Sequence, residues 1–201
     1  PPPHPAPPAG RVRRAVTGAS TSVYCRGMYR LTTPDADGYR EWAACLAEFG
    51  DGPIDGSGFE GRPDLSAAAF QAYIADRARW ADTSIPVPEG FVHCDFRWIT
   101  GPGGQLLGFL AIRHTLTPVL LEQGGHIGYS VRPTSRNRGV AGAALALGLA
   151  EAQALGITPV LLTVREDNLA SRRVMERAGG SYEDTRNGFR RYWFSGPHRG
   201  Q

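Results

Sequence analysis

The sequence contains no lysine, because all 22 of its basic residues are arginine. A phosphate-binding loop of the Gly-x-x-x-x-Gly-Lys type needs a lysine, and a pyridoxal enzyme needs one for its Schiff base. The sequence therefore argues against nucleotide hydrolysis of that type and against pyridoxal chemistry.

Cysteine is also scarce, with only Cys25, Cys45 and Cys94. Three cysteines, odd in number and widely spaced, indicate neither a disulfide framework nor a zinc site, so we expect no bound metal. No apolar run approaches the ~20 residues that a membrane-spanning helix needs. Together with the mild net charge of +3, these absences predict a soluble, cytoplasmic protein without a membrane partner.

The arginines do not form a nucleic-acid-binding pattern either. Arg172-Arg173 and Arg190-Arg191 are isolated pairs without interleaved aromatic residues, and such side chains are usually solvated. We therefore expect no nucleic-acid partner.

A chain of 201 residues fits one domain with a sizeable core. Its start is rich in proline and includes Arg11, Arg13 and Arg14, but it lacks the apolar stretch of a secretory signal. We expect a flexible arm over residues 1–22, a single domain over 23–196 and a tail over 197–201.

The apolar periodicity changes along the chain from helical to strand-like. Tyr39, Trp42, Leu46 and Phe49 recur at spacings of three and four, which predicts a helix. Beyond Gly90 the period is two. We expect strands at about Arg26 to Leu31, Val92 to Ile99, Leu106 to His114, His126 to Val131, Pro159 to Val164, Ser181 to Thr185 and Phe189 to Phe194. We expect helices from Thr33-Pro34-Asp35 to Gly50, after Ser66, from Gly139 to Leu155 and from Asn168 to Gly179-Gly180. This order predicts an α+β fold in which helices pack on a mixed sheet.

The turn between the strand that ends at Val131 and the following helix is suited to bind an anion. Gly139, Ala141 and Gly142 are small, so a phosphate group could approach the unpaired N–H groups and positive dipole of the helix start. Arg136 and Arg138 would add charged donors. The alternative is that these small residues only allow close packing on the sheet.

The same turn resembles a motif of the GNAT acyltransferase superfamily, Arg/Gln-x-x-Gly-x-Gly/Ala, which is matched here as Arg136-x-x-Gly139-x-Ala141. A second block begins with Asn168-x-x-Ser171 and ends with Glu176-Arg177-Ala178-Gly179-Gly180. The strings Gly124-Gly125-His126-Ile127-Gly128-Tyr129 and Arg191-Tyr192-Trp193 look like a bacterial branch whose members mostly have no assigned function. The likeness covers roughly Arg30 to Phe194.

This resemblance implies a mainly antiparallel sheet, flanked by helices and splayed between the Val131 and Pro159 strands, with the pantetheine arm of an acyl-CoA in the gap. Main-chain groups near Ser130 and Val131 would bind the pantetheine. Asn168 would contact the cofactor arm together with Ser171, or would only cap its helix. The implied cofactor-binding residues of the turn are Arg136, Asn137, Arg138, Gly139, Val140, Ala141 and Gly142.

The resemblance also implies direct attack of an amine on the thioester. His126 is our first candidate for the general base because its pKa lies near neutrality, although alternation with Gly128 and Ser130 could turn it away from the site. Superfamily members often carry a tyrosine acid on the last helix, where this sequence has Met175. The general acid would then be solvent or one of Tyr129, Tyr182 and Tyr192.

The acceptor should be recognised by the first two helices and the loop between them. Glu48, Asp51, Asp55 and Glu60 lie there and would attract a cationic amine, unless they form only a solvated acidic loop. We expect an acetyltransferase for a small-molecule amine, as a monomer or homodimer. The alternatives are acetylation of a protein or peptide amine, and a non-catalytic acyl-CoA sensor.

Overall fold

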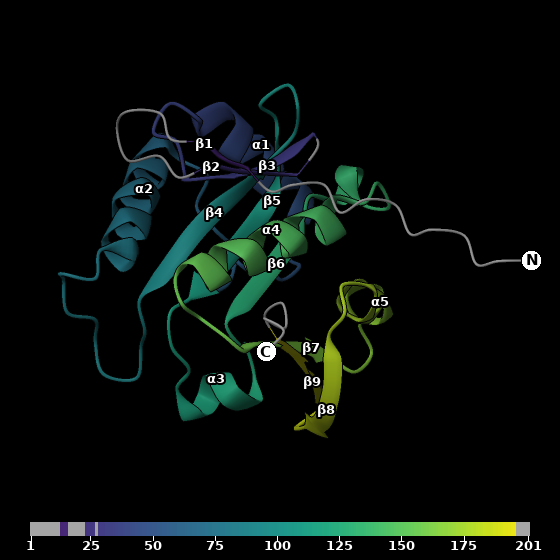
Figure 1. The fold of residues 1–201 in the computed structure, drawn as a ribbon. Coiled ribbons are helices and arrows are strands. Elements are labelled where there is room, and N and C mark those ends of the chain that lie inside the picture. Colours follow the sequence, from purple (N-terminus) through teal and green to yellow (C-terminus); the bar gives the residue numbers. More distant parts are fainter. Residues whose placement is uncertain (1–12, 16–22, 27, 196–201) are drawn as a thin grey trace, which may run out of the picture.

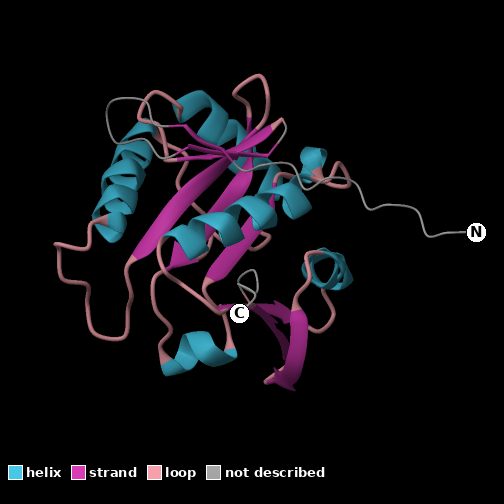
Figure 2. Ribbon diagram, in the orientation of Figure 1, coloured by secondary structure: helices cyan, strands magenta, loops and turns pink. Residues whose placement is uncertain are grey.

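The computed structural model describes residues 13–15, 23–26 and 28–195, whose strands form two sheets (Figures 1 and 2). The larger sheet has six strands in the order β1-β2-β3-β4-β5-β6, and the smaller has three in the order β7-β9-β8. Every pairing between these strands is antiparallel. The strands are β1 (Arg13–Ala15), β2 (Val23–Arg26), β3 (Tyr29–Thr32), β4 (Cys94–Thr100), β5 (Leu106–Arg113), β6 (Ile127–Val131), β7 (Val160–Arg165), β8 (Ser181–Arg186) and β9 (Phe189–Phe194).

Helices cover both faces of the large sheet (Figure 1). Helices α1 and α2 pack on one face against Trp98 and Phe109, while α4 packs on the other against Leu110 and Ile112. The α4 face is close-packed, because a Cβ at Gly148 would lie 3.0 Å from a methyl group of Leu110. The helices are α1 (Tyr39–Phe49), α2 (Ala67–Ala81), α3 (Pro118–Glu122), the 3-10 turn η1 (Pro133–Ser135), α4 (Val140–Ala154) and α5 (Leu169–Arg177).

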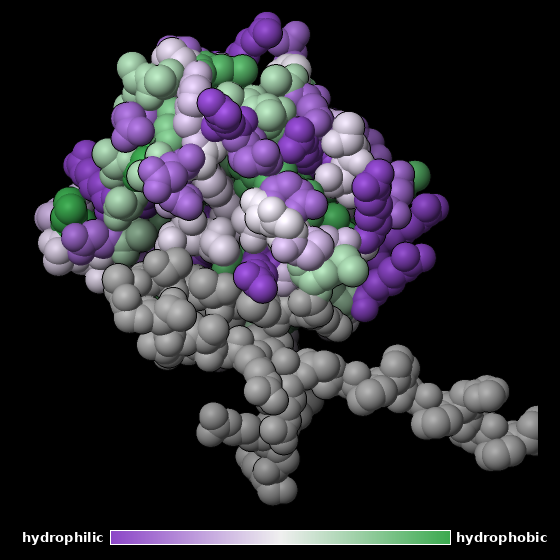
Figure 3. All heavy atoms as spheres, turned by 90° about the horizontal axis from the view of Figure 1, so that it is seen from above, coloured by the Kyte–Doolittle hydropathy of each residue, from purple (hydrophilic) through white to green (hydrophobic). Residues whose placement is uncertain are grey.

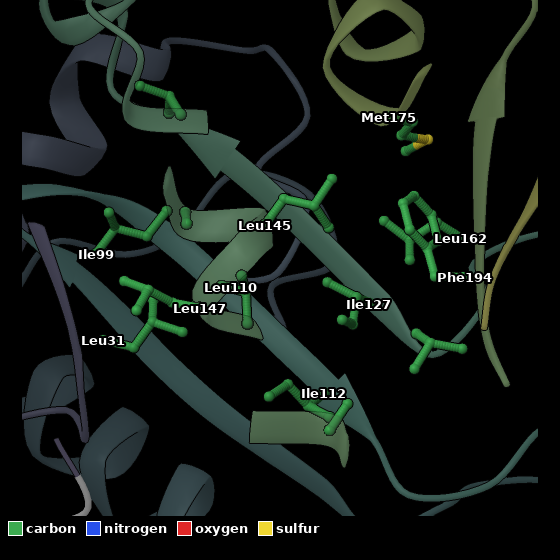
Figure 4. Close-up of a cluster of buried hydrophobic side chains, with 14 of the residues drawn as sticks. Leu31, Ile99, Leu110, Ile112, Ile127, Leu145, Leu147, Leu162, Met175 and Phe194 are labelled. Carbon is green, nitrogen blue, oxygen red and sulfur yellow. The ribbon is translucent and has the colours of Figure 1, made fainter. Parts of the chain in front are cut away.

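The two sheets separate at β6 and β7, which confirms the splayed sheet expected from the sequence. An isolated bridge between Gly125 and Leu162 connects the sheets at one end of β6. The hydrophobic core nevertheless runs continuously from Leu31 under α4 to Leu162 and Phe194 (Figure 4). The two sheets therefore share one core, with an open strand edge inside it.

Most sequence-predicted elements are confirmed to within a few residues. The strand at Phe189–Phe194 matches the prediction, and the Ser66 hydroxyl accepts a hydrogen bond from the Ala69 N–H at 3.2 Å, as a helix cap should. Strands β1 and β2 and helix α3 were not predicted. Strand β1 lies within the segment expected to be a flexible arm, and the rest of residues 1–22 and residues 196–201 are outside the described residues.

The first helix begins later than predicted. Asp35 accepts a hydrogen bond from the Asp37 N–H at 3.0 Å, and its carbonyl accepts one from the Gly38 N–H at 3.0 Å. These local bonds form a turn that competes with the helix. Gly38 then approaches β4 so closely that a Cβ there would lie 2.4 Å from the Trp98 ring, so the helix starts at Tyr39.

A buried ionic cluster fixes α4 on the sheet. The Arg97 guanidinium on β4 donates from Nε to Glu151 of α4 at 2.7 Å and lies 3.4 Å from the Asp95 carboxylate. All three side chains are buried. Removing one partner of such a cluster leaves an uncompensated buried charge, so the cluster favours one placement of α4.

No helix in the described ranges is both long and apolar enough to cross a membrane. Viewed from above, the described surface is mostly hydrophilic with small scattered hydrophobic patches (Figure 3).

Candidate active site

The turn from β6 into α4 forms an open cradle of main-chain groups. Gly139, the residue before α4, has φ of +78°, and Asn137 has φ of +61°. A Cβ at Gly139 or Gly142 would meet no atom within 4 Å. No side chain of the described residues caps the helix, and its first turn carries no acidic residue. The first N–H groups of this 15-residue helix are thus free for an anion, and the turn fits a diphosphate.

Two contacts fix the arginines of the turn without covering the cradle. Arg136 donates from Nε to the Val131 carbonyl at 3.1 Å, and the Arg138 carbonyl accepts from the Tyr29 hydroxyl at 3.0 Å. Both guanidinium groups are otherwise exposed, whereas the Val140 side chain is buried. Val140 can therefore offer an anion only its main-chain N–H.

Glu48 holds the turn from the opposite face of the sheet. Its carboxylate accepts from Arg132 Nε at 2.6 Å, from the Thr134 N–H at 3.2 Å and from the Thr134 hydroxyl at 2.9 Å. Desolvation opposes ionisation of Glu48, but these hydrogen bonds outweigh it and lower the pKa of the carboxyl. Glu48 therefore links α1 to the turn and does not join the other acidic residues with which the sequence grouped it.

The open edge of β6 presents main-chain groups toward β7. The Arg113 N–H donates to the His126 carbonyl at 2.7 Å, and the Arg132 N–H donates to the Leu107 carbonyl at 2.8 Å. In an antiparallel pair these bonds fix the alternation, so the main chain of Ser130 is directed to β5. The N–H and C=O groups of Tyr129 and Val131 are directed to the gap, which favours these two residues for hydrogen bonds to a bound chain.

Tyr129 lies where the two sheets separate. Its buried hydroxyl has no hydrogen-bond partner of good geometry in the described part of the chain, although the Ser171 side chain on α5 lies beside it. Burial raises the pKa of Tyr129 to about 12, the Ser171 hydroxyl opposes this, and the charge of Asp55 adds to it. The phenol therefore stays protonated around neutral pH and can donate a hydrogen bond.

The other tyrosine candidates are engaged elsewhere. The Tyr192 hydroxyl donates to Glu176 at 2.8 Å, and Tyr182 is half exposed with its hydroxyl 3.0 Å from Thr185. Met175 is buried against the core near Leu162 and Phe194 (Figure 4). Of the three candidates for the acid, Tyr129 alone lies at the open edge of β6.

His126 connects the two sheets. Its Nδ1 accepts a hydrogen bond from the Leu161 N–H at 2.9 Å, and the main-chain N–H of His126 donates to the Leu161 carbonyl at 2.7 Å. Burial, and secondarily the charge of Arg113, lower the pKa of His126 to about 4. A neutral imidazole with Nδ1 occupied carries its proton on Nε2, so neither nitrogen offers a free lone pair. This arrangement weighs against His126 as the general base.

A cavity of about 1050 Å³ opens on the α2 face of the sheet. Its floor includes Phe96, Ala111 and Arg113, and its walls come from the loop after α1, from α2 and from α3. Asp51, Asp55 and Glu60 line this cavity, and a contact of any of them with an acceptor stays a prediction. The cavity thus lies on the face of the sheet opposite α4, and Gly56 in its lining lies against Gly128 of β6.

The comparison with protein families decides the identity. A family model described as an acetyltransferase (GNAT) domain matches residues 28–181, more than half of the chain. The chain belongs to the GNAT acetyltransferase family. It is accordingly an acyl-CoA-dependent acetyltransferase.

Solved acetyltransferases share this fold. RimJ of Mycobacterium smegmatis in complex with a CoA disulfide has a TM-score of 0.64 at 18% identity, covering 86% of this chain and 84% of that chain. The ribosomal L7/L12 α-N-protein acetyltransferase RimL in complex with CoA has a TM-score of 0.61 at 13% identity, covering 85% of this chain and 95% of that chain. The microcin C7 self-immunity acetyltransferase MccE in complex with acetyl-CoA and AMP has a TM-score of 0.56 at 11% identity, covering 85% of this chain and 93% of that chain. No curated protein matches the sequence significantly.

The second block of the GNAT acetyltransferase begins at α5, where Asn168 Oδ1 accepts from the Ser171 N–H at 3.1 Å. Asn168 therefore caps α5, and its contact with a cofactor stays a prediction. No group of three or more potential metal ligands occurs within the described ranges.

Sequence reasoning missed several residues that line the cavity of the acetyltransferase. Arg77, Trp80, Phe91 and Arg113 come from α2, from the loop before β4 and from β5. The strand alternation of β5 could have placed Arg113 on the face of Ala111. The aromatic residues had no such signal, because their convergence depends on how α2 packs against the sheet.

Proposed function

We propose that this protein is an N-acetyltransferase that moves the acetyl group of acetyl-CoA to the primary amine of a small molecule by direct attack. The observation that carries the proposal is the open edge of β6 between an anion cradle on one side and a cavity on the other. When bound, acetyl-CoA supplies a thioester whose carbonyl carbon an amine can attack.

The cradle residues Arg136 to Gly142 would hold the diphosphate through main-chain N–H groups and the two guanidinium groups. Main-chain groups of Tyr129 and Val131 would orient the pantetheine, with Asn168 and Ser171 at its other side. Glu48 would keep the cradle in place through Arg132 and Thr134.

We assign the departing thiolate a hydrogen bond from the Tyr129 hydroxyl. A phenol with a pKa of about 12 remains protonated beside a thiol whose ordinary pKa is about 8.5, so it stabilises the thiolate by donating a hydrogen bond. The proton of the amine passes to water in the open cavity, because His126 offers no free lone pair.

Direct attack is supported by the state of the buried thiols. Desolvation by burial raises the pKa of Cys45 to about 12 and that of Cys94 to about 12. Thiols with such pKa values remain protonated at neutral pH and are poor nucleophiles, although Cys94 lines the cavity. An acyl-enzyme formed on either of them is therefore disfavoured.

A second candidate function is acetylation of a protein N-terminus. The printed name of RimL describes an α-N-protein acetyltransferase, and the cavity is large enough to admit the end of a chain. In contrast, MccE was solved with the nucleotide AMP, so this fold also occurs in proteins with small ligands.

The test is release of CoA thiol from acetyl-CoA with a panel of small amines and a panel of short peptides with free N-termini. Turnover of small amines supports the proposal, and turnover of peptides alone favours the second candidate. Tight acetyl-CoA binding without any turnover would indicate a sensor. Because the chain lacks lysine, acetylation of its own lysine side chains cannot contribute to the signal.

A further inference from the structure

The cavity on the α2 face contains one carboxylate that is both unpaired and next to β6. Seven ionisable side chains of opposite signs line this cavity, namely Asp51, Asp55, Glu60, Asp76, Arg62, Arg77 and Arg113. Asp51 pairs with Arg62 at 3.4 Å, and Asp76 pairs with Arg77 at 2.7 Å. Asp55 and Glu60 have no ion pair within the described ranges.

The remaining cation of the cavity, Arg113, is bound to the main chain. Its Nη1 donates to the carbonyls of Gly124 and Gly125 at 3.2 Å each. These bonds hold the guanidinium beside β6 without neutralising it by a carboxylate. The four acids and three arginines leave one excess negative charge in the cavity, which favours a cationic ligand.

The Asp55 position is fixed by the residue that follows it. Gly56 has φ of +81°, and a Cβ there would lie 2.5 Å from the Gly128 carbonyl and 2.9 Å from the Leu110 Cα. The loop therefore rests directly on β5 and β6, where a side chain would not fit. Because Asp55 directly precedes Gly56, it is held close to Gly128 of β6.

Asp55 is also electrically coupled to this edge. Its charge acts on Tyr129, and its own pKa is raised by burial, with the Arg113 charge opposing the shift. Asp55 is nevertheless an exposed residue and lines the cavity. A ligand ammonium group could therefore contact its carboxylate.

Part of the cavity lining is apolar. The rings of Trp80 and Phe91 lie 5.5 Å apart, and Arg77 stacks on the Phe96 ring with its Cζ 4.3 Å from the ring centroid. Phe91 is 56% exposed and Val119 is 71% exposed, although both line the cavity. Exposed apolar side chains around one opening indicate that an apolar group covers them.

We propose that Asp55 binds the ammonium group of the acceptor, and that the acceptor is a primary amine on an aromatic or aliphatic body that reaches the Trp80–Phe91 wall. This inference rests on the proposed function, whose acceptor class it specifies. Asp55 is a specificity residue in this scheme, because it places the nitrogen at the edge of β6. The ammonium group loses one proton to water, and the neutral amine attacks the thioester carbonyl. The C–N bond forms, the nitrogen loses its second proton to water, and the C–S bond breaks to release the CoA thiolate.

The test is calorimetric titration of the CoA-bound protein with tryptamine and phenethylamine, because binding to CoA-bound protein needs no turnover. We expect the wild type to bind both amines and to bind tryptophol, the alcohol analogue of tryptamine, at least about 10-fold more weakly. Asp55→Asn should weaken tryptamine binding about 10- to 100-fold, the effect of losing a charge-assisted hydrogen bond.

Asp51→Asn is the matched control, since it removes the same charge from the same loop at an exposed pair with Arg62. It should change tryptamine affinity by no more than about threefold. Unchanged acetyl-CoA affinity and circular dichroism in Asp55→Asn would show that the fold is intact, and Asp55→Glu should retain more affinity than Asp55→Asn.

The inference is overturned if the wild type binds neither amine, if tryptophol binds as tightly as tryptamine, or if Asp51→Asn and Asp55→Asn weaken binding equally. Binding of peptides only, independent of Asp55, would also overturn it and favour a protein acceptor. The proposed function fails separately, if the wild type shows no affinity for acetyl-CoA and no amine-dependent thiol release.

Discussion

Replacing Gly139 with glutamate places a carboxylate where the account puts the diphosphate of acetyl-CoA. Two effects can be separated. The first is strain, because Gly139 has φ of +78° and a side chain in the left-handed region costs about 1 to 2 kcal/mol. For a domain of this size each kcal/mol lowers Tm by about 2 to 4 °C. The variant should therefore melt about 2 to 8 °C lower and still fold.

The second effect is on binding. The Gly139 Cβ position has no neighbouring atom within 4 Å, so the new carboxylate extends into the cradle without disturbing the protein. It would occupy the helix start and repel the phosphates. If two charge-assisted hydrogen bonds of about 1.5 to 3 kcal/mol each are lost, affinity falls at least about 100-fold.

The assay is calorimetric titration with acetyl-CoA, with melting followed by circular dichroism. Gly188→Glu is the matched control, because Gly188 has φ of +79° and equally open space in the β8–β9 turn. It should lose similar stability and keep wild-type affinity. Gly139→Ala adds strain without charge and should bind much better than Gly139→Glu. Wild-type affinity in Gly139→Glu would refute the assignment of the cradle.

Three further predictions concern residues that support the site. Glu48→Gln should lower the free energy of unfolding by about 1 to 3 kcal/mol and weaken acetyl-CoA binding. Because the pKa of Glu48 is lowered in the folded protein, the extra stability of the wild type over this variant, measured by urea titration, should fade as pH falls below about 4.5. A stability difference independent of pH would contradict this. Tyr129→Phe should reduce kcat about 10-fold or more with little change in acetyl-CoA affinity, whereas an unchanged kcat would remove Tyr129 from the reaction. His126→Ala should lower the free energy of unfolding by about 1 to 3 kcal/mol at pH 7.5, because the buried Leu161 N–H loses its acceptor. Since the pKa of His126 in the folded protein is about 4, wild-type stability should decline from pH 6.5 toward 4 more steeply than that of the variant. A turnover defect without a stability defect would restore His126 as the base.

The fold was largely predictable because its elements carry local signals. Alternation gave the strand at Phe189–Phe194, and the Ser66 cap marked α2. Strands β1 and β2 had no such signal, since they are only three and four residues long and the surrounding composition is typical of an arm. The short helix α3 has a proline at its start and a capping Thr117, a signal that was present and was overlooked.

The site was predictable where it depends on one continuous segment. The β6–α4 turn could be read from Arg136 to Gly142, because the geometry of a helix start follows from neighbouring residues. Charge pairing could not be read in this way. Glu48 and Asp55 lie in one acidic stretch of the sequence, but Glu48 faces Arg132 while Asp55 enters the cavity. Only the packing of α1 on the sheet separates them.

The most direct measurement is a crystal structure of the protein with CoA. The account predicts that diphosphate oxygens lie at hydrogen-bond distance, about 2.7 to 3.2 Å, from main-chain nitrogens of Val140, Ala141 or Gly142, with the pantetheine along Tyr129 and Val131. CoA bound at another part of the surface, with the start of α4 free, would contradict it.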